Sequence, residues 1–323
     1  MSRVPIIYIL SVGRSGSTLL ELLLARRRGV AGIGEFHRFT DFIEADALCA
    51  CGVPVRQCDL WTRVLDLVPS ANTEGVSFHT DAFGLGLIRL LRAYFHCLFG
   101  RPLGVRHRET ACLNARLLSA TLEATDCAYI VDSSKNLGRL CAMHQSGLFD
   151  LRVVHLVRDG RGVAYSQCKP KIKSAAQHPA WTVPRSFAWA VRRWIVLNVL
   201  GMLLGSTRLR GRYVRLRYED LAADPGGMVD AVLAAAGIRD TPPLGIDASP
   251  MPISHAIGGN SMRQRPLRAI QVDDEWRHRI GRKDRVVSEL LGIRVVNWLV
   301  HRNSVQAASH IDDQGTANAG GRN

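Results

Sequence analysis

A cluster of small, hydroxyl-bearing and basic residues lies near the start of the chain, from Gly13 to Thr18 (GRSGST). The glycines permit close backbone approach, the Ser and Thr hydroxyls add hydrogen-bond donors, and Arg14 contributes a full positive charge. An apolar stretch precedes the cluster and a helix-forming stretch follows it, so free backbone N–H groups and the helix dipole meet at the turn. This combination favours a phosphate-binding loop over an ordinary strand-to-helix turn with Ser and Thr caps.

A second polar cluster begins at Arg158 and reads RDGRGVAYS, so that Ser166 follows eight residues after the arginine. It comes directly after the apolar run over 151–157 and leads into a stretch of helical composition. A guanidinium fork and a hydroxyl at this spacing can converge on a second phosphate group. An Arg-Asp pair after a strand is equally typical of a surface turn, so this cluster alone does not decide between the two.

The first cluster differs from the Walker A loop, G-x-x-x-x-G-K-[ST], which binds nucleoside triphosphates. Its second glycine follows the first after only two residues, and no lysine follows that glycine. The apolar run Leu156-Val157 leads to Arg158 and not to a magnesium-binding aspartate. A phosphate site with arginines in place of a metal ion points away from kinases, and we predict that no metal is required.

Apolar runs and turn residues predict an α/β fold with a parallel sheet around these clusters. We expect strands over 5–12, 29–34, 128–131, 151–157 and 212–216. We expect helices over 19–27, 184–204 and 227–236. The run over 5–12 (PIIYILSV) is almost continuously apolar, as in a strand that is buried on both faces of a parallel sheet. Polar clusters follow several strands at their carboxyl ends, where open α/β sheets bind ligands.

Glu35 and Lys135 are further residues at strand ends that could act on a substrate. Glu35 follows Gly34 at the end of the second expected strand, and Lys135 follows the third. A carboxylate in this position can accept a proton, and a lysine can neutralise a leaving phosphate. Glu35 could instead be a structural carboxylate that binds Arg38 or a backbone turn.

Three histidines are alternative bases: His37, His155 and His255. His155 lies inside an apolar strand, where a core histidine with satisfied hydrogen bonds is the favoured interpretation. His255 lies in a segment rich in Gly and Asn and could face the site.

The two phosphate-type clusters together resemble sulfotransferases that use 3′-phosphoadenosine-5′-phosphosulfate (PAPS). The resemblance is closest to the bacterial and tyrosylprotein-type branches, runs from residue 6 to about residue 276, and leaves 40–125 uncovered. It implies a P-loop-like parallel sheet flanked by helices in three layers. It also implies that the loop Gly13 to Leu19 binds the 5′-phosphosulfate, that Arg158 and Ser166 bind the 3′-phosphate, and that Glu35 is the base.

The resemblance extends to Lys135, to Tyr218-Glu219-Asp220-Leu221, and to a late loop with Gly258-Gly259-Asn260 and Arg263. The sequence departs from the family pattern in two ways. Arg14 stands where cytosolic small-molecule enzymes have lysine, and there is no obvious counterpart of their catalytic histidine. The predicted catalytic residues are Glu35, Arg14 and Lys135. The predicted donor-binding residues are Gly13, Arg14, Ser15, Gly16, Ser17, Thr18, Leu19, Arg158, Ser166, Tyr218, Gly259, Asn260 and Arg263.

These residues predict in-line transfer of a sulfuryl group from PAPS to an acceptor hydroxyl, with a carboxylate base. Such a transfer needs positioning, neutralisation of the leaving phosphate, here by Arg14 and Lys135, and removal of the acceptor proton. A sulfuryl group carries less charge than a phosphoryl group, so basic side chains can suffice without a metal ion. The acceptor stays open among carbohydrate, lipid, small molecule and protein tyrosine. A P-loop-type nucleotide or small-molecule kinase is the second candidate, although it requires the Walker lysine that this loop lacks.

The chain is strongly basic, because 42 Lys and Arg against 28 Asp and Glu give a net charge of +14. This charge implies anionic partners and supports a third candidate, a binding module for nucleic acid or anionic lipid. The basic residues are spread along the chain without a nucleic-acid-binding signature, so we predict no nucleic-acid partner. Peripheral contact with a membrane stays compatible with an enzyme that acts on a lipid.

We expect one domain over 1–310, with a helical insert over 40–125 as the acceptor region, and a disordered tail over 311–323. The apolar stretch Val4 to Leu10 is too short for a secretory signal. The stretch Trp194 to Gly205 is about a dozen residues long, short of the ~20 that cross a bilayer, and predicts a buried helix. These features predict a cytoplasmic enzyme.

Eight cysteines in a chain of this length, without a secretory signal, do not suggest a disulfide scaffold. Cys49, Cys51 and Cys58 form a local cluster spaced C-x-C-x6-C, which could hold zinc if a fourth ligand came from elsewhere. The spacing is not that of paired C-x2-C ligands, so structural thiols, reduced or locally paired, are favoured. We therefore predict no metal site.

Overall fold

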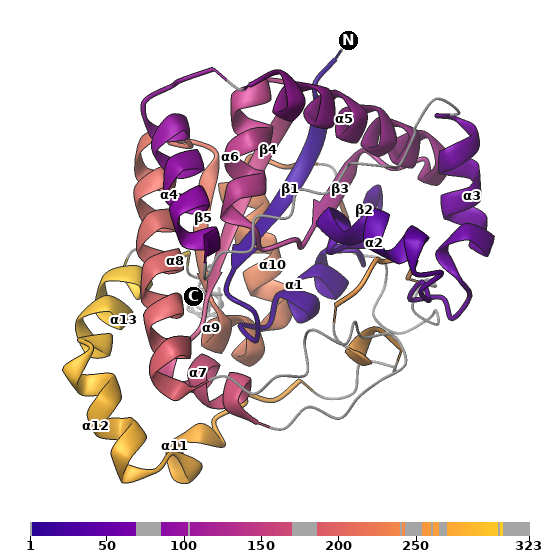
Figure 1. The fold of residues 1–323 in the computed structure, drawn as a ribbon. Coiled ribbons are helices and arrows are strands. Elements are labelled where there is room, and N and C mark those ends of the chain that lie inside the picture. Colours follow the sequence, from indigo (N-terminus) through magenta and orange to yellow (C-terminus); the bar gives the residue numbers. More distant parts are fainter. Residues whose placement is uncertain are drawn as a thin grey trace, which may run out of the picture.

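Five parallel strands form the sheet in the centre of the protein, in the order β2-β3-β1-β4-β5 (Figure 1). Their bounds are β1 Val4–Ser11, β2 Val30–Gly34, β3 Tyr129–Asp132, β4 Phe149–Val157 and β5 Tyr213–Arg217. The computed structural model describes residues 2–68, 85–102, 104–169, 186–239, 241–242, 254–259, 261–264, 270–302 and 304–305. All five expected strands form close to their predicted bounds, which confirms the predicted α/β fold with a parallel sheet.

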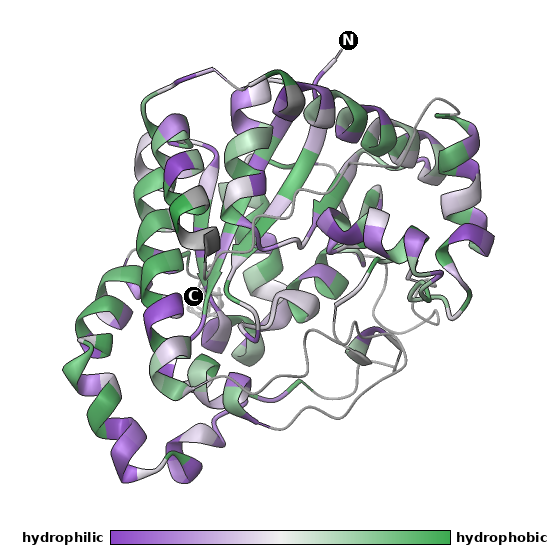
Figure 2. Cartoon of the chain, viewed as in Figure 1, coloured by the Kyte–Doolittle hydropathy of each residue, from purple (hydrophilic) through white to green (hydrophobic). Residues whose placement is uncertain are grey.

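The central strand β1 is buried on both faces. It pairs with β3 on one side and β4 on the other. Ile6 and Tyr8 face one hydrophobic core, whereas Ile7 and Ile9 face a second core on the opposite side. A strand covered on both faces must be apolar throughout, which is why this run shows no polar alternation. Figure 2 shows β1 and β4 as largely hydrophobic.

Helices cover both faces of the sheet and give the protein three layers (Figure 1). The first core includes side chains from α5 (Val105–Thr125), α6 (Leu137–Ser146) and α8 (Phe187–Thr207). The second core includes side chains from α1 (Ser17–Leu24), α9 (Tyr218–Ala223) and α10 (Pro225–Ala235). The helix α7 (Gly160–Cys168) follows β4 and packs against α8.

The segment between β2 and β3 is helical over most of its described residues. It contains η1 (Phe36–Arg38), α2 (Phe39–Glu44), η2 (Val55–Gln57), α3 (Asp59–Asp66), α4 (Leu85–Leu98) and α5. Trp61 of α3 is fully buried, with ring centroids 4.9 Å from Phe39 and 5.9 Å from Phe36. This aromatic contact anchors α3 beside the end of β2.

The helix α8 is longer than the apolar stretch that the sequence singled out. It has 21 residues, and its length and hydropathy would be sufficient for it to cross a membrane. Its Trp194 and Leu204 are fully buried, and the helix contacts β1, β4 and β5. The packing against the sheet is that of a core helix, as predicted.

The last described helices, which the sequence analysis did not predict, are α11 (Trp276–Arg279), α12 (Arg282–Leu290) and α13 (Ile293–His301). They pack against α7 and α8. A short helix, η4 (Ser261–Gln264), belongs to the late loop. The predicted tail over 311–323 lies outside the described residues.

Candidate active site

The carboxyl ends of the five strands meet at one edge of the sheet and gather most of the predicted site residues. The loop Gly13 to Thr18 follows β1, and Glu35 follows β2. Lys135 and Arg158 follow β3 and β4, and Tyr218 follows β5 directly. Strands β3 and β4 lie on opposite sides of β1, an arrangement that opens a binding crevice outside the strand ends in α/β sheets.

The turn after β1 has the backbone of an anion-binding loop. Arg14 (φ 78°) and Gly16 (φ 90°) both adopt left-handed conformations. A Cβ atom on Gly16 would lie 2.4 Å from Cδ2 of Tyr218, so a larger residue does not fit beneath this ring. Helix α1 begins at Ser17, and its first N–H groups have neither an intrahelical acceptor nor a side-chain cap from Gly16. The buried hydroxyl of Ser15 has no hydrogen-bond partner among the described residues, which fits a site that receives a polar ligand.

The guanidinium of Arg14 points toward the β4 side of the site. Its Nε donates to Ser166 Oγ at 2.9 Å, and Arg158 donates to the Arg14 carbonyl at 3.1 Å. Arg14 therefore stands beside the two residues predicted to bind the 3′-phosphate. Partial desolvation of its guanidinium, followed by the charge of Arg158, lowers the pKa of Arg14. The positive charges of Arg14 and Arg158 repel each other, and an anion bound beside both guanidinium groups would offset this repulsion.

Arg158 is buried, and three contacts hold it in addition to its hydrogen bond to the Arg14 carbonyl. Its guanidinium lies 4.7 Å from the centroid of the Tyr218 ring and donates to the Asp273 carbonyl at 2.6 Å. It also forms an ion pair with Asp273 Oδ2 at 3.0 Å. The Tyr218 hydroxyl accepts from the backbone N–H of Asp273 at 3.3 Å. The Asp273 carboxylate thus binds the part of the Arg158 guanidinium that could otherwise bind a phosphate oxygen.

Glu35 and Lys135 form an ion pair, with 2.5 Å between Glu35 Oε1 and Lys135 Nζ. The side chains are 13% and 14% exposed, so the pair is mostly buried but keeps some access to solvent. Burial raises the pKa of Glu35, but the charge of Lys135 and the hydrogen bond from Lys135 outweigh it and lower the pKa below its ordinary value. Glu35 is therefore ionised at neutral pH. Arg38, the alternative partner considered for Glu35, forms an ion pair with Asp41 at 3.5 Å.

Lys135 stands in a turn whose backbone is fixed by polar contacts. Asp132 accepts from the N–H two residues further on at 2.9 Å. Asn136 caps α6 by accepting from the N–H of Arg139 at 3.1 Å. Lys135 itself has a left-handed backbone (φ 60°), as Arg14 does. Such strained residues cost about 1–3 kcal/mol each and cluster at functional sites.

A buried ion pair that the sequence analysis did not predict lies beneath this edge. Glu21 of α1 accepts from both terminal nitrogens of Arg263, at 2.7 and 2.6 Å, and from the backbone N–H of Gly34 at 2.8 Å. The fully buried Glu21 carboxylate requires a cation, which Arg263 supplies, and the predicted contact of Arg263 with the donor stays a prediction. The available signal was a glutamate inside the otherwise apolar helix STLLELLL. Asn260 lies outside the described residues.

The other predicted donor-binding residues lie around the same loop. The first turn of α1 is formed by Ser17, Thr18 and Leu19. The Leu19 side chain packs in the second core, so its backbone is the part available to a ligand. The Gly13 carbonyl accepts from a glutamine of α7 at 2.9 Å. A Cβ atom on Gly259 (φ 93°) would lie 2.5 Å from an arginine Nε, so this glycine permits close packing of the late loop.

The three histidines predicted as alternative bases lie in different surroundings. His155 is fully buried, with its Nδ1 2.6 Å from Tyr213 Oη and its Nε2 2.9 Å from Asn198 Oδ1, which confirms the predicted core histidine. Burial lowers the pKa of His155 to about 4 and that of His37 to about 3, so both are neutral at pH 7. The Nδ1 of His255 lies 3.1 Å from a cysteine sulfur.

The fold and the site together define an α/β protein that can bind phosphorylated groups at a strand-to-helix turn and hold a carboxylate beside them. Residues 5–242 match the model of the sulfotransferase family, and the chain belongs to this family. The family predicted from the sequence is thereby confirmed.

Curated relatives agree with this assignment, and a solved structure shares the fold. Carbohydrate sulfotransferase 6 of Homo sapiens is 30% identical over 172 residues, which cover 48% of this chain and 43% of that protein. Carbohydrate sulfotransferase 5 of Mus musculus is 30% identical over 174 residues, which cover 49% and 43%. The chain thus spans less than half the length of these curated relatives. The sulfotransferase domain from the Synechococcus PCC 7002 olefin synthase shares the fold, with a TM-score of 0.50, 21% identity, and coverage of 90% and 96%.

Proposed function

We propose that the protein transfers the sulfuryl group of PAPS to an acceptor hydroxyl. The observation that carries this proposal is the ion pair of Glu35 and Lys135, at the same sheet edge as the anion-binding turn and Arg158. PAPS is the donor expected for the sulfotransferase family. In this arrangement, a proton acceptor and the cations for the leaving phosphate lie at one edge, as in-line transfer requires.

We assign the 5′-phosphosulfate to the turn after β1 and to Lys135, and the 3′-phosphate to Arg158 and Ser166. The contact of Arg14 with Ser166, at 2.9 Å, supports a role for Arg14 at the 3′-phosphate in addition to the leaving phosphate. The ion pair between Arg158 and Asp273 would be replaced by the 3′-phosphate. Charge-assisted bonds from an arginine fork suit this group. We assign Gly259 and Arg263 to the support of the loop.

The proposed reaction forms one S–O bond and breaks another. The acceptor oxygen bonds to sulfur, its proton passes to Glu35, and the S–O bond to the 5′-phosphate breaks to release 3′,5′-ADP. Lys135 holds Glu35 ionised before the reaction and neutralises the negative charge that develops on the leaving phosphate. This balance of charge uses only side chains, and we propose that no catalytic metal is required.

We propose a carbohydrate hydroxyl as the first acceptor class to test, because both curated relatives are named carbohydrate sulfotransferases. The segment over 40–125 begins beside Glu35, and we infer that it forms the acceptor region of a single domain over 1–310. Lipid, small-molecule and protein-tyrosine hydroxyls are the comparison substrates in the same assay.

Isothermal titration calorimetry in EDTA tests the donor. We expect 3′,5′-ADP and PAPS to bind without added metal, and ATP to bind more weakly. Tight ATP binding that requires magnesium would favour the kinase, and salt-dependent binding of nucleic acid without turnover would favour the binding module. A transfer assay with radiolabelled PAPS and a panel of acceptors then tests the reaction. Absence of PAPS binding to the folded chain would refute the proposal.

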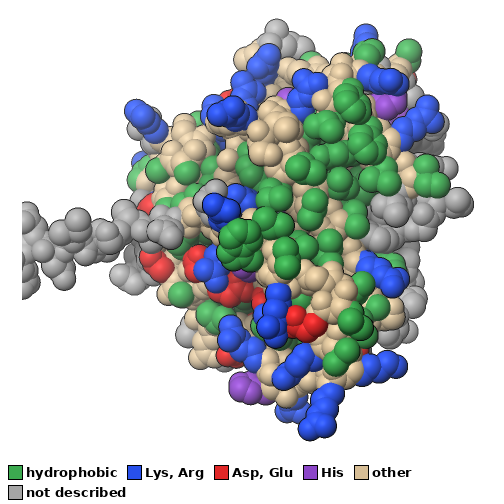
Figure 3. All heavy atoms as spheres, turned by 90° about the vertical axis from the view of Figure 1, so that its left-hand side faces the viewer, with side chains coloured by type: hydrophobic (Ala, Val, Ile, Leu, Met, Phe, Trp, Pro, Cys, Tyr) green, Lys and Arg blue, Asp and Glu red, His purple; other side chains and the backbone are tan. Residues whose placement is uncertain are grey.

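We also propose peripheral contact with anionic membranes through the face formed by α4, α8 and α13. Figure 3 shows apolar side chains gathered on this face with Lys and Arg around them. Phe95 of α4, Phe99 directly after α4, Leu203 of α8 and Trp298 of α13 are exposed. Exposed apolar patches mark interaction sites, and the net charge of +14 suits anionic headgroups. Sedimentation with anionic but not neutral vesicles would support such contact, and sedimentation with neither would refute it.

A further inference from the structure

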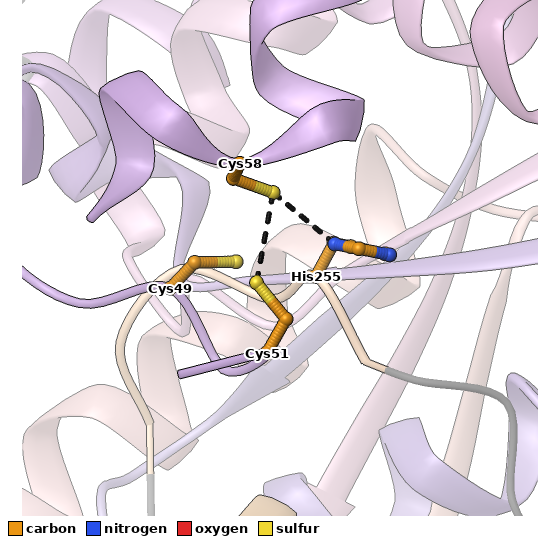
Figure 4. Close-up of side chains that lie close together, drawn as sticks. All are labelled: Cys49, Cys51, Cys58 and His255. Carbon is orange, nitrogen blue, oxygen red and sulfur yellow. Dashed lines mark hydrogen bonds between the residues drawn. The ribbon is translucent and has the colours of Figure 1, made fainter. Parts of the chain in front are cut away.

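We propose that Cys49, Cys51, Cys58 and His255 bind one structural zinc ion. Three of these residues lie between α2 and α3, and the fourth lies in the late loop. One ligand atom from each residue lies within 4.8 Å of the other three. Figure 4 shows the three sulfur atoms and Nδ1 of His255 pointing toward one another. The proposed transfer reaction uses none of them.

The distance between two of the sulfur atoms fits a four-coordinate ion. With Zn–S bonds of about 2.3 Å, two sulfur ligands of a tetrahedral ion lie about 3.8 Å apart. The sulfur atoms of Cys51 and Cys58 are 3.7 Å apart, and Cys58 Sγ is 3.1 Å from His255 Nδ1. Cys49 and Cys58 are fully buried. Four protein ligands therefore close the coordination shell without water, which is the pattern of structural zinc sites.

Contacts outside the cluster hold these ligands in place. The backbone N–H of Cys49 donates to the Val53 carbonyl at 2.8 Å, and the N–H of Gly52 donates to the Cys49 carbonyl at 2.9 Å. Gly52 has a φ of 95°, which permits this tight turn. The indole N–H of Trp61 donates to the His255 carbonyl at 2.8 Å. The turn and the late loop are thus oriented toward a common centre.

The chemistry of the four side chains favours zinc over a disulfide. A disulfide between Cys51 and Cys58 requires sulfur atoms about 2.05 Å apart and would leave Cys49 and His255 without a role. Thiolates together with an imidazole suit zinc. The spacing of the cysteines alone did not predict this site, because the fourth ligand lies 197 residues beyond Cys58.

A zinc ion in this position would stabilise the backbone around the proposed base. The N–H of Ala50 donates to the carbonyl of Ala256, next to the ligand His255, at 3.1 Å. Ile257 then pairs with the end of β2, and its carbonyl accepts from the backbone N–H of Glu35 at 2.7 Å. The zinc ion would thereby help to fix the backbone position of Glu35. The importance of this effect for catalysis rests on the proposed function, whereas zinc binding itself does not.

Metal analysis of the full chain, purified without an affinity tag under reducing conditions, tests the proposal. We expect about one zinc ion per chain, as one closed site requires. The control Cys112→Ser, which removes an exposed thiol outside the cluster, should keep this content. Cys58→Ser and His255→Gln should each retain less than about a tenth of it. If these variants do not fold, cobalt replaces zinc in the unsubstituted chain, and the absorption of tetrahedral thiolate-bound cobalt gives the readout.

Three results would overturn the proposal. The first is folded protein that contains no zinc and binds neither zinc nor cobalt under reducing conditions. The second is a disulfide between Cys51 and Cys58 in protein whose thiols were blocked at lysis. The third is full zinc content in both folded ligand variants. Metal content is measured without PAPS or acceptor, so its failure is distinguishable from failure of the proposed transfer activity.

Discussion

Replacing Glu35 by glutamine tests the proposed base at the atom that would take the proton. Glutamine has nearly the same size and can accept the hydrogen bond from Lys135, but its amide does not accept a proton at neutral pH. We expect kcat to fall about 10²–10⁴-fold, which corresponds to about 2.7–5.5 kcal/mol of activation free energy. The affinity for PAPS, measured by calorimetry, should change little, because the donor is assigned to other side chains.

The same substitution removes a mostly buried ion pair and should lower stability moderately. Exposed pairs contribute about 0–1 kcal/mol, whereas breaking a fully buried pair costs about 3–5 kcal/mol. With side chains 13% and 14% exposed, the pair of Glu35 and Lys135 lies between these limits. The variant should therefore stay folded, with a lower Tm. Glu44→Gln, an equivalent change at an exposed position of α2, is the matched control and should alter neither kcat nor Tm.

The pH dependence separates a base from a structural carboxylate. Because the folded-state pKa of Glu35 is lowered, its contribution to stability is present above the unfolded-state pKa and is lost as pH falls through the folded pKa. The acid limb of kcat/KM should lie at a lower pH than the ordinary pKa of a glutamate for the same reason. Lys135→Met removes a charge that lowers this pKa, so burial should then raise it and move the acid limb to higher pH. The reasoning is refuted if folded Glu35→Gln keeps more than about a tenth of parental kcat, or if Lys135→Met leaves the acid limb unmoved.

Three further substitutions test the donor site by calorimetry and thermal unfolding. Arg158→Ala should weaken PAPS binding by about 1.5–3 kcal/mol and reduce the preference for PAPS over adenosine 5′-phosphosulfate, and an unchanged preference would contradict the 3′-phosphate assignment. Asp273→Asn removes the carboxylate that pairs with Arg158, so it should tighten 3′,5′-ADP binding, and weaker binding by a folded variant would oppose the proposed displacement. Gly16→Ala should lower Tm and abolish donor binding. The added Cβ atom would lie 2.4 Å from the Tyr218 ring, and the left-handed backbone would cost the alanine about 1–3 kcal/mol. A stable variant with normal affinity would contradict this expectation.

The sequence alone was sufficient for the sheet and for the residues at its edge. The run over 5–12 is almost continuously apolar, as a strand that is buried on both faces must be. The other strands were also predicted from short apolar runs. The loop Gly13 to Thr18, Glu35, Lys135 and Arg158 each follow such a strand, and parallel strands bring their carboxyl ends to one edge. The order of these motifs therefore predicted which residues would gather, and this order also carried the family resemblance.

Tertiary structure alone decided which side chains meet across long stretches of chain. Arg263 pairs with Glu21 from 242 residues away, and His255 meets Cys58 from 197 residues away. Arg14 meets Ser166 because the loop after β1 and the helix α7 follow two neighbouring strands, β1 and β4. Apolar periodicity is a local property that the backbone repeat imposes on neighbouring residues. The partner of a buried charge or thiol is set instead by which segments pack together, since a polar group removed from water must find its counterpart among the atoms that the fold brings near it.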